Sequence, residues 1–317
     1  MNAAAPRYSL ILSAYNSHGT LRRSLESLRR QTLRDFETIV VDSSPGAEGA
    51  AIAREYPEVR LIRPGRRLWM HDARNLGAQH ARAPRLVFTD PDCVAEPDWL
   101  AQLDAAFEAG HRFLGGPIAC WPGGVLERAV HIAKFWQWLP GGGSRLYPDV
   151  ATANMAVERA LFDLVGGIPT DNTSGDTGFC VRLRERAGLR PWFVDAARTT
   201  HIHEVTWRGA FAERFARGHG FAQLRAGMAG WTRGHALVVG LAWPLLALRH
   251  LGVKLVLCAR RRQLGALLGA WPVVLALDTA WMAGQAAGAW RAVLPGPPTP
   301  RKTPGERGGA PAAGRAG

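Results

Sequence analysis

Cysteine is scarce in this sequence, and its spacing excludes two classes of protein. The chain of 317 residues has 4 cysteines, at positions 93, 120, 180 and 258. None of them forms a Cys-x-x-Cys pair, which argues against a zinc module, and secreted disulfide scaffolds have far denser cysteine. We therefore expect reduced thiols in a reducing compartment such as the cytosol.

Targeting and repeat signals are also missing. Residues 1–7 hold no apolar run ahead of the first strand-like segment, so no signal peptide is expected. No solenoid period is visible. The contents of 47% apolar and 21% charged residues are those of an ordinary globular chain, of a length that suits one large or two modest domains.

Acidic residues are too few to balance the basic ones. Asp and Glu number 26 against 39 Lys and Arg, which gives a net charge of +13 and a pI near 10.8. Such a balance points to an anionic partner: nucleic acid, an anionic membrane surface or a phosphorylated ligand. Because the arginines are spread along the chain and no reader motif is present, we expect no nucleic-acid partner.

Strand-like and helical patterns alternate from residue 8 to about residue 194, and one further helical pattern follows. The strand-like runs are residues 8–12, 36–42, 59–62 and 85–89. The helical patterns are residues 20–32, 48–55, 71–82, 126–138, 158–165, 177–187 and 207–219. Strands that alternate with helices predict an α/β fold whose parallel strands are joined by right-handed crossovers.

Polar side chains follow three of the predicted strands. Asn16 comes after the first, Asp42 ends the second, and Asp90 and Asp92 follow the apolar run Arg-Leu-Val-Phe-Thr. Ligands bind at the carboxyl ends of strands in such sheets, and two carboxylates flanking one residue can hold a divalent cation. Turn formation or helix capping is the plainer interpretation of each residue taken alone.

The ordered motifs resemble the family-2 glycosyltransferases, which have the GT-A fold. SLILSAYN resembles the family's first strand and VVDSS its second, and residues 71–100 resemble its Arg-Asn-x-Gly segment, apolar strand, D-x-D and Pro-x-Trp-Leu. Residues 152–168 resemble the acceptor-side segment. The resemblance covers residues 8 to 225 and implies a Rossmann-like mixed, mainly parallel sheet flanked by helices.

The resemblance also assigns ligands. It implies that Asp90 and Asp92 hold Mg²⁺ or Mn²⁺ on the diphosphate of a nucleotide-sugar, most simply a UDP-sugar. The residues that it places around the donor are Ala14, Tyr15, Asn16, Asp42, Arg74, Asn75 and Asp90. The metal would neutralise negative charge on the departing nucleoside diphosphate.

The position of the catalytic base departs from the family pattern. Where the family has Glu-Asp ahead of a helix, this chain has SGDTGFCVRL, with Gly175 in place of the glutamate and Asp176 at the aspartate. The resemblance makes Asp176 the base that deprotonates the acceptor hydroxyl; a helix N-cap is the alternative, and Glu204 is the next candidate base. The Gln-x-x-Arg-Trp motif of processive synthases is absent, which favours transfer of a single sugar.

Two histidines at alternate positions form a further candidate site. His201 and His203 would point to the same face of a strand, as metal ligands can, although buried histidines bonded to carbonyls are the plainer interpretation. The family often has a histidine near the donor diphosphate at the place of His201, so His201 is a candidate metal or diphosphate contact.

Two apolar segments follow residue 230. Each uninterrupted run, Ala236–Leu248 and Leu264–Leu277, is shorter than the roughly 20 residues needed to cross a membrane. An extension of the second run to Trp290 would bury Asp278 and Gln285, which is costly unless they are paired.

Three features of this region point to a membrane. His250, Lys254 and Arg261 share one helical face, as in an in-plane amphipathic helix, and the basic block 260–262 suits the cytoplasmic side. The spacing of Gly284 and Gly288 favours close helix packing. We expect association with the cytoplasmic face of the inner membrane, in-plane or as a shallow hairpin; helices packed on the catalytic domain are the alternative.

These observations give three predicted regions and one leading function. The regions are a GT-A domain at 1–230, a hydrophobic helical region at 231–294 and a disordered tail at 295–317. The function is metal-dependent, inverting transfer of one sugar to a hydroxyl acceptor, in cell-envelope or exopolysaccharide synthesis on a lipid-linked glycan. A nucleotidyltransferase and an inactive sugar-binding relative are the alternatives.

Overall fold

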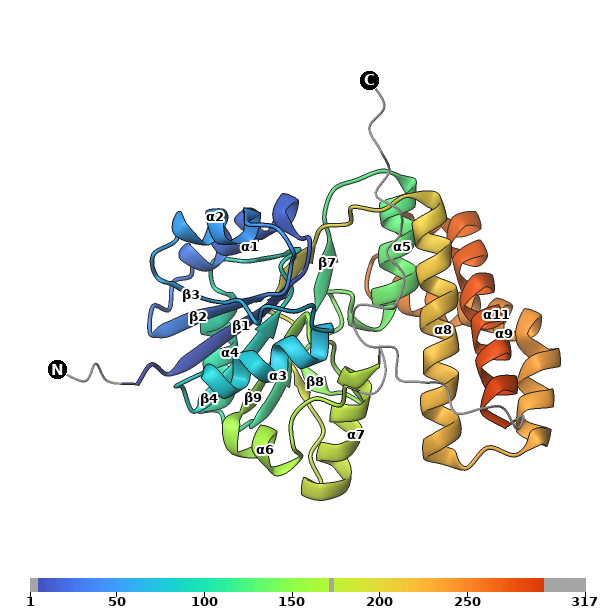
Figure 1. Cartoon of the computed structure of the whole chain (residues 1–317). Helices are drawn as coiled ribbons and strands as arrows, with labels where there is room; N and C mark the ends of the chain where they lie inside the picture. Colours follow the sequence, from blue (N-terminus) through green and yellow to red (C-terminus); the bar gives the residue numbers. More distant parts are fainter. Residues whose placement is uncertain (1–4, 171–173, 294–317) are drawn as a thin grey trace.

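The computed structural model describes residues 5–170 and 174–293 (Figure 1). The predicted tail at 295–317 lies outside these residues. The chain forms an α/β unit built on a mixed sheet, followed by a bundle of long helices (Figure 1).

The main sheet confirms the predicted mixed, mainly parallel architecture. Its strand order is β3-β2-β1-β4-β9-β6-β10-β8. The four parallel strands at one side are β1 (Tyr8–Ala14), β2 (Phe36–Asp42), β3 (Val59–Ile62) and β4 (Arg85–Thr89). The others are β6 (Phe113–Gly115), β8 (Arg145–Leu146), β9 (Asn154–Glu158) and β10 (Trp192–Phe193). Strand β9 runs antiparallel to both β4 and β6.

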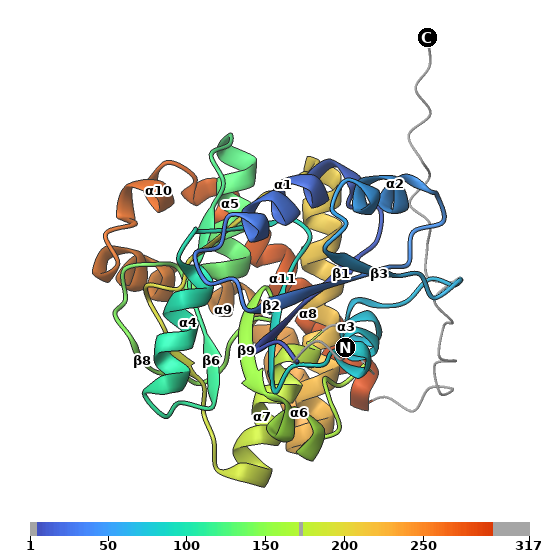
Figure 2. The same cartoon turned by 90° about the vertical axis from the view of Figure 1, so that its left-hand side faces the viewer.

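Helices cover both faces of this sheet. The flanking helices are α1 (His18–Arg29), α2 (Glu48–Arg54), α3 (Met70–His80), α4 (Trp99–Glu108), α6 (Arg159–Leu164) and α7 (Gly175–Ala187). Helices α1 and α2 lie on one side of the strands, and α6 and α7 lie on the other (Figure 2). A hydrophobic core lies on each face of the sheet, and strand β1 contributes to both. Leu10 and Leu12 pack toward α1 and α4, and Ile11 packs toward α6 and α7. A strand buried on both faces explains the continuous apolar run in its sequence.

A small second sheet lies beside the carboxyl end of β4. Its order is β5-β11-β7, with β5 (Cys93–Ala95), β7 (Ile118–Cys120) and β11 (Thr199–His201). The register sets His201 opposite Cys93 on one side and Cys120 on the other. This sheet therefore brings residue 201 next to the D-x-D segment.

Within the described residues, the helical bundle contains three long helices and three shorter ones. The long helices are α8 (Trp207–Ala229), α9 (Arg233–Arg260) and α11 (Trp271–Val293), and the shorter ones are α5 (Val125–Phe135), η1 (Trp136–Trp138) and α10 (Leu264–Leu268). Helix α11 packs along α8 and α9 and also contacts α5 (Figure 1). Close packing at the predicted glycine pair is confirmed: a Cβ atom on Gly284 would lie 2.1 Å from the carbonyl oxygen of Phe215.

The helix lengths correct the sequence-based limits. The run Ala236–Leu248 is only part of the 28-residue helix α9, which continues through Arg249, His250 and Lys254. Among the described residues, α9 is the one helix with the length and composition to cross a membrane, and only 11% of its most apolar window is buried. The uninterrupted run is shorter than a membrane span, but the helix that contains it is long enough to cross one.

A buried ion cluster joins these helices. Asp278 on α11 is fully buried, and both of its carboxylate oxygens accept hydrogen bonds from the buried Nζ of Lys254 on α9. The Nη2 atom of Arg214 on α8 lies 3.4 Å from Asp278 Oδ1. The pairing that a buried Asp278 requires is thus present, and it explains how α11 extends past residue 277.

Loss of this pairing should destabilise the chain strongly. Replacement of Asp278 by Asn leaves the charges of Lys254 and Arg214 uncompensated in a buried site, so we expect about 3–5 kcal/mol less stability to unfolding. Chemical unfolding followed by circular dichroism measures this loss. The matched control is Glu55→Gln in the exposed pair with Arg22, where little change is expected. Equal losses in the two variants would contradict the assigned role of the cluster.

Candidate functional site

A cavity of about 700 Å³ opens where the sheet meets the helical bundle. One wall is formed by the segments that follow β1 and β4, and the opposite wall by side chains of α8, α9 and α11. A third wall is formed by Lys134 of α5 and by the aromatic turn Trp136–Trp138 that follows this helix. The long helices therefore complete the cavity rather than lying apart from it.

Four potential metal ligands meet at the end of β4, and three of them, Asp90, Asp92 and His201, line this cavity. One ligand atom from each of Asp90, Asp92, Cys93 and His201 lies within 4.8 Å of the others. The Nε2 atom of His201 is 3.4 Å from Asp92 Oδ2. Asp92 Oδ1 and His201 Nδ1 are buried and have no hydrogen-bond partner. Buried polar atoms without partners are costly, and a divalent cation with a preference for oxygen ligands would satisfy this set.

The pKa values of the two carboxyl groups are shifted in opposite directions. Burial, and then the charge of Asp90, raise the pKa of Asp92 to about 7. Burial also acts to raise the pKa of Asp90, but the neighbouring charges, that of Arg74 foremost, outweigh it and hold this pKa below its usual value. Two close carboxylates thus share a site that favours one negative charge unless a cation enters.

Arg74 holds the first of these carboxylates. Its buried guanidinium donates a hydrogen bond to Asp90 Oδ1 and contacts the ring of His71 one helical turn earlier. The Nε2 atom of His71 accepts a hydrogen bond of 3.2 Å from the backbone N–H of Gly175. A chain of contacts therefore runs from the metal-ligand group to the start of α7.

The structure divides the predicted donor residues into two sets. Ala14, Tyr15, Arg74 and Asp90 line the cavity, and the guanidinium carbon of Arg67 lies 4.2 Å from the centre of the Tyr15 ring. Asn16, Asp42 and Asn75 are not among its lining residues.

Each residue of the second set makes local contacts. Asn16 has a positive φ of 51°, and its N–H donates to Ser44 Oγ at 2.8 Å. Asp42 is buried and accepts hydrogen bonds from the backbone and hydroxyl of Ser44. Asn75 bonds the backbone N–H and carbonyl of Ile168. These bonds shape the loops behind the cavity.

Asp176 lies in the cavity within the first turn of α7. Its Oδ1 atom accepts a hydrogen bond of 2.9 Å from the N–H of Thr177, and burial raises its pKa. The residue at the N-cap position is Ser174, so the predicted alternative of Asp176 as the cap does not hold. Glu204, the other candidate base, is exposed beside Gly19 and does not line the cavity.

Packing explains the departure at residue 175. A Cβ atom there would lie 2.3 Å from the carbonyl oxygen of Pro169 and 2.6 Å from the ring of His71. The glutamate of the family pattern therefore does not fit in this chain, and Gly175 is required by the backbone around it.

Sequence reasoning missed a fourth carboxylate in the cavity, in addition to Asp90, Asp92 and Asp176. Asp149 has a buried Oδ1 atom with no hydrogen-bond partner, and burial, followed by the charge of Asp176, raises its pKa to about 6. It lies in an irregular segment between β8 and β9. Because no motif surrounds it, only its position in space could identify it.

The helical wall of the cavity is basic. The cations that line it are Lys134, Arg214, Arg217, Arg225 and Arg249. Glu213 compensates part of this charge through a bond of 2.7 Å to Arg217. A wall of this kind suits a phosphorylated ligand held between the bundle and the carboxylates.

Comparisons with known proteins agree with this architecture. Residues 9–156 match the family model described as glycosyl transferase family 2. A PGL/p-HBAD biosynthesis glycosyltransferase of Mycobacterium bovis is 34% identical over 114 residues, which cover 34% of this chain and 44% of that protein. The alignments with the first three curated relatives span 25–66% of those proteins' own length.

Solved structures share the fold over most of the chain. The mannosyltransferase PcManGT of Pyrobaculum calidifontis, solved with GDP-Man and Mn²⁺, superposes with a TM-score of 0.60 at 20% identity. That superposition covers 91% of this chain and 88% of the other. GalNAc-T7, solved with UDP, GalNAc and Mn²⁺, gives a TM-score of 0.53 at 17% identity over 72% of this chain and 52% of the other. The predicted resemblance is confirmed, and the chain carries a glycosyl transferase family 2 domain on a GT-A fold.

Proposed function

We propose that the chain is a metal-dependent, inverting glycosyltransferase that moves a single sugar from a nucleotide-sugar to a hydroxyl acceptor. One observation carries this proposal: a single cavity holds both the Asp90–Asp92–His201 group and the separate carboxylate of Asp176. The first group suits a nucleotide diphosphate with its cation, and the second suits an acceptor hydroxyl.

The donor side is built for a charged leaving group. Asp90, Asp92 and His201 would hold Mg²⁺ or Mn²⁺, as the buried atoms without partners suggest and as the Mn²⁺ in both structural neighbours supports. The cation supplies charge neutralisation for the departing diphosphate. Arg74 fixes the orientation of Asp90 through their ion pair, and Tyr15 with Ala14 borders the space for the nucleoside of a UDP-sugar donor.

The acceptor side needs a base. The acceptor oxygen bonds to the anomeric carbon as the bond from that carbon to the diphosphate oxygen breaks, and the hydroxyl proton passes to the Asp176 carboxylate. Burial raises the pKa of this carboxyl, which makes its ionised form a stronger base. Burial, followed by the charge of the nearby Asp176, raises the pKa of Asp149.

The helical region supports a membrane-bound acceptor. The face of α9 that carries Leu237, Val238, Leu241, Leu245 and Leu248 is exposed. Its inward face is mostly small and apolar, with Ala236, Ala247 and Cys258, and it includes Lys254, which pairs with Asp278. The exposed leucines of the outward face suit a helix in contact with lipid.

The cavity reaches this lipid-facing helix. Val239, Leu246 and Arg249 of α9 line the cavity, together with Arg225 of α8. A lipid-linked glycan with a phosphate linkage would meet apolar and cationic side chains there, which favours a role in cell-envelope or exopolysaccharide synthesis. We place this contact at the cytoplasmic face, where the exposed Arg260 and Arg262 would meet anionic lipid. Arg261 is not part of that basic surface, because it is buried and bonded to Leu139 and Tyr147.

The metal assignment predicts a specific loss in one variant. Asp92→Asn keeps the shape of the side chain and removes its charge, so the thermal stabilisation of the chain by UDP plus Mn²⁺ should disappear. Thermal unfolding with UDP, with Mn²⁺ and with both measures this effect, since a ligand of the folded state raises its stability. Asp98→Asn, at an exposed position on the same segment, is the control that should behave as wild type. Undiminished Mn²⁺-dependent stabilisation in Asp92→Asn would overturn the assignment.

The base assignment predicts a loss of rate without a loss of donor binding. Asp176→Asn should lower turnover by about 10²–10⁴-fold, the usual contribution of general-base catalysis, with donor affinity nearly unchanged. The rate of the wild type should fall as the pH drops through the raised pKa of Asp176, because the protonated carboxyl cannot accept a proton. Asp149→Asn separates the two carboxyls: a larger loss there than at Asp176 would transfer the role to Asp149.

The membrane assignment rests on the exposed face of α9. The double variant Leu241→Ser/Leu245→Ser should sediment with anionic lipid vesicles much less than wild type, because apolar burial drives the binding. The matched control is Leu146→Ser/Leu164→Ser, which changes two leucines of similar exposure on β8 and α6. If both double variants lose lipid binding equally, or neither does, α9 is not the contact surface.

A further inference from the structure

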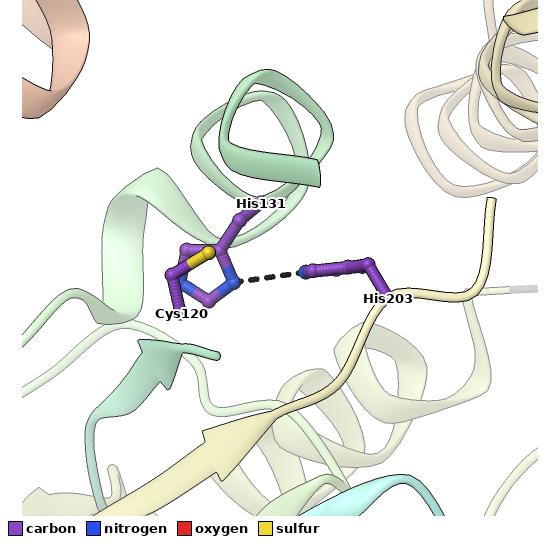
Figure 3. Close-up of side chains that lie close together, drawn as sticks. All are labelled: Cys120, His131 and His203. Atoms are coloured by element: carbon purple, nitrogen blue, oxygen red, sulfur yellow. Dashed lines mark hydrogen bonds between the residues drawn. The ribbon is translucent and has the colours of Figure 1, made fainter. Parts of the chain in front are cut away.

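Three metal-ligating side chains gather outside the cavity. Cys120 ends β7, His131 belongs to α5, and His203 follows β11 (Figure 3). One ligand atom from each lies within 4.8 Å of the other two. None of the three lines the cavity described above. The group is therefore distinct from the set around Asp92.

His131 is oriented as a ligand would be. Its Nε2 atom lies 3.1 Å from the carbonyl oxygen of Ile118, an acceptor, so Nε2 carries the proton and donates it. The Nδ1 lone pair then points at His203, as Figure 3 shows, with 3.0 Å between Nδ1 and the Nε2 atom of His203. A metal-binding histidine commonly gives its other N–H to a backbone carbonyl, which fixes the tautomer.

The other two ligands are held from different sides. The ring of His203 stacks on that of His201 with 4.4 Å between centroids, and Phe135 packs against both rings. The thiol of Cys120 has only a weak contact of 3.4 Å with its neighbour's carbonyl.

We propose that Cys120, His131 and His203 form a binding site for a zinc ion. One thiolate and two imidazoles are the soft and borderline ligands that Zn²⁺ takes, whereas the oxygen-rich set at Asp90 and Asp92 suits Mg²⁺ or Mn²⁺. Binding replaces the hydrogen bond between the two histidines by two nitrogen–metal bonds, and the proton on His203 Nε2 moves to the Nδ1 atom of the same ring, so that the imidazole stays neutral. The thiol of Cys120 forms the sulfur–metal bond, and its proton leaves to solvent.

Such a site would fasten three elements beside the catalytic cavity. It joins the end of β7 to α5 and to the segment after β11. The ring of His201 lies against His203. Helix α5 carries Lys134 of the cavity wall and is followed directly by the aromatic turn Trp136–Trp138. The zinc ion would therefore act as a structural tie that positions His201, rather than as a second catalytic metal.

Cobalt substitution tests the site directly. Co²⁺ added to the metal-free full chain should produce an intense thiolate-to-cobalt charge-transfer band, and equimolar Zn²⁺ should abolish it. Cys120→Ser should lose the band and His203→Gln should weaken or lose it. Cys93→Ser should keep it, although Cys93 lies in the other ligand group. Asp92→Asn should also keep it.

The outcomes separate the two metal groups. Absence of the band in wild type overturns the proposal, as does a band that survives in Cys120→Ser or disappears in Cys93→Ser. Circular dichroism checks that each variant is folded. If Cys120→Ser does not fold, His203→Gln with its thiol intact decides: a band as strong as that of wild type there overturns the site. Failure of the glycosyltransferase assays leaves this test unaffected, because it reads metal ligation alone.

Discussion

The repulsion between two carboxylates at the end of one buried strand governs much of this structure. Asp90 and Asp92 are separated by one residue, and each is partly removed from water. Arg74 reduces this repulsion, because its guanidinium forms an ion pair with Asp90. Asp92 lies beside His201, and its Oδ1 atom has no hydrogen-bond partner in the protein. Arg74 in turn contacts His71, and His71 fixes the start of α7 where Asp176 stands. The positions of donor and acceptor groups are thereby linked through one set of charges.

The sequence predicted well those elements whose formation depends on their own residues. The strands at 36–42, 59–62 and 85–89 have the limits expected of them, because each contains a cluster of apolar, mostly β-branched or aromatic residues and is followed by a turn or loop. The D-x-D pair was recognisable because its strand precedes it directly. The metal and base roles inferred from these motifs remain proposals.

Features built from distant segments were not predictable in the same way. The lengths of α9 and α11 depend on the ion pair between Lys254 and Asp278. When each segment is read alone, its charged residue looks like the end of an apolar run. Asp149 and the Cys120–His131–His203 group have no motif, since only the folded chain brings their partners near. The cysteine spacing argues against a Cys-x-x-Cys module, but it carries no information about one cysteine that meets two histidines from other elements.

The attachments of α9 have a consequence for geometry at a bilayer. Within α9, Lys254 forms an ion pair with Asp278 of α11. Just past the end of α9, Arg261 is hydrogen-bonded to Leu139 and Tyr147 next to the cavity. A helix held at two points along its length cannot roll about its own axis. For a chain seated on lipid through this helix, the tilt of the catalytic domain and the height of the cavity above the surface become fixed quantities. The fold would then select acceptors by the distance between the membrane surface and their reacting hydroxyl.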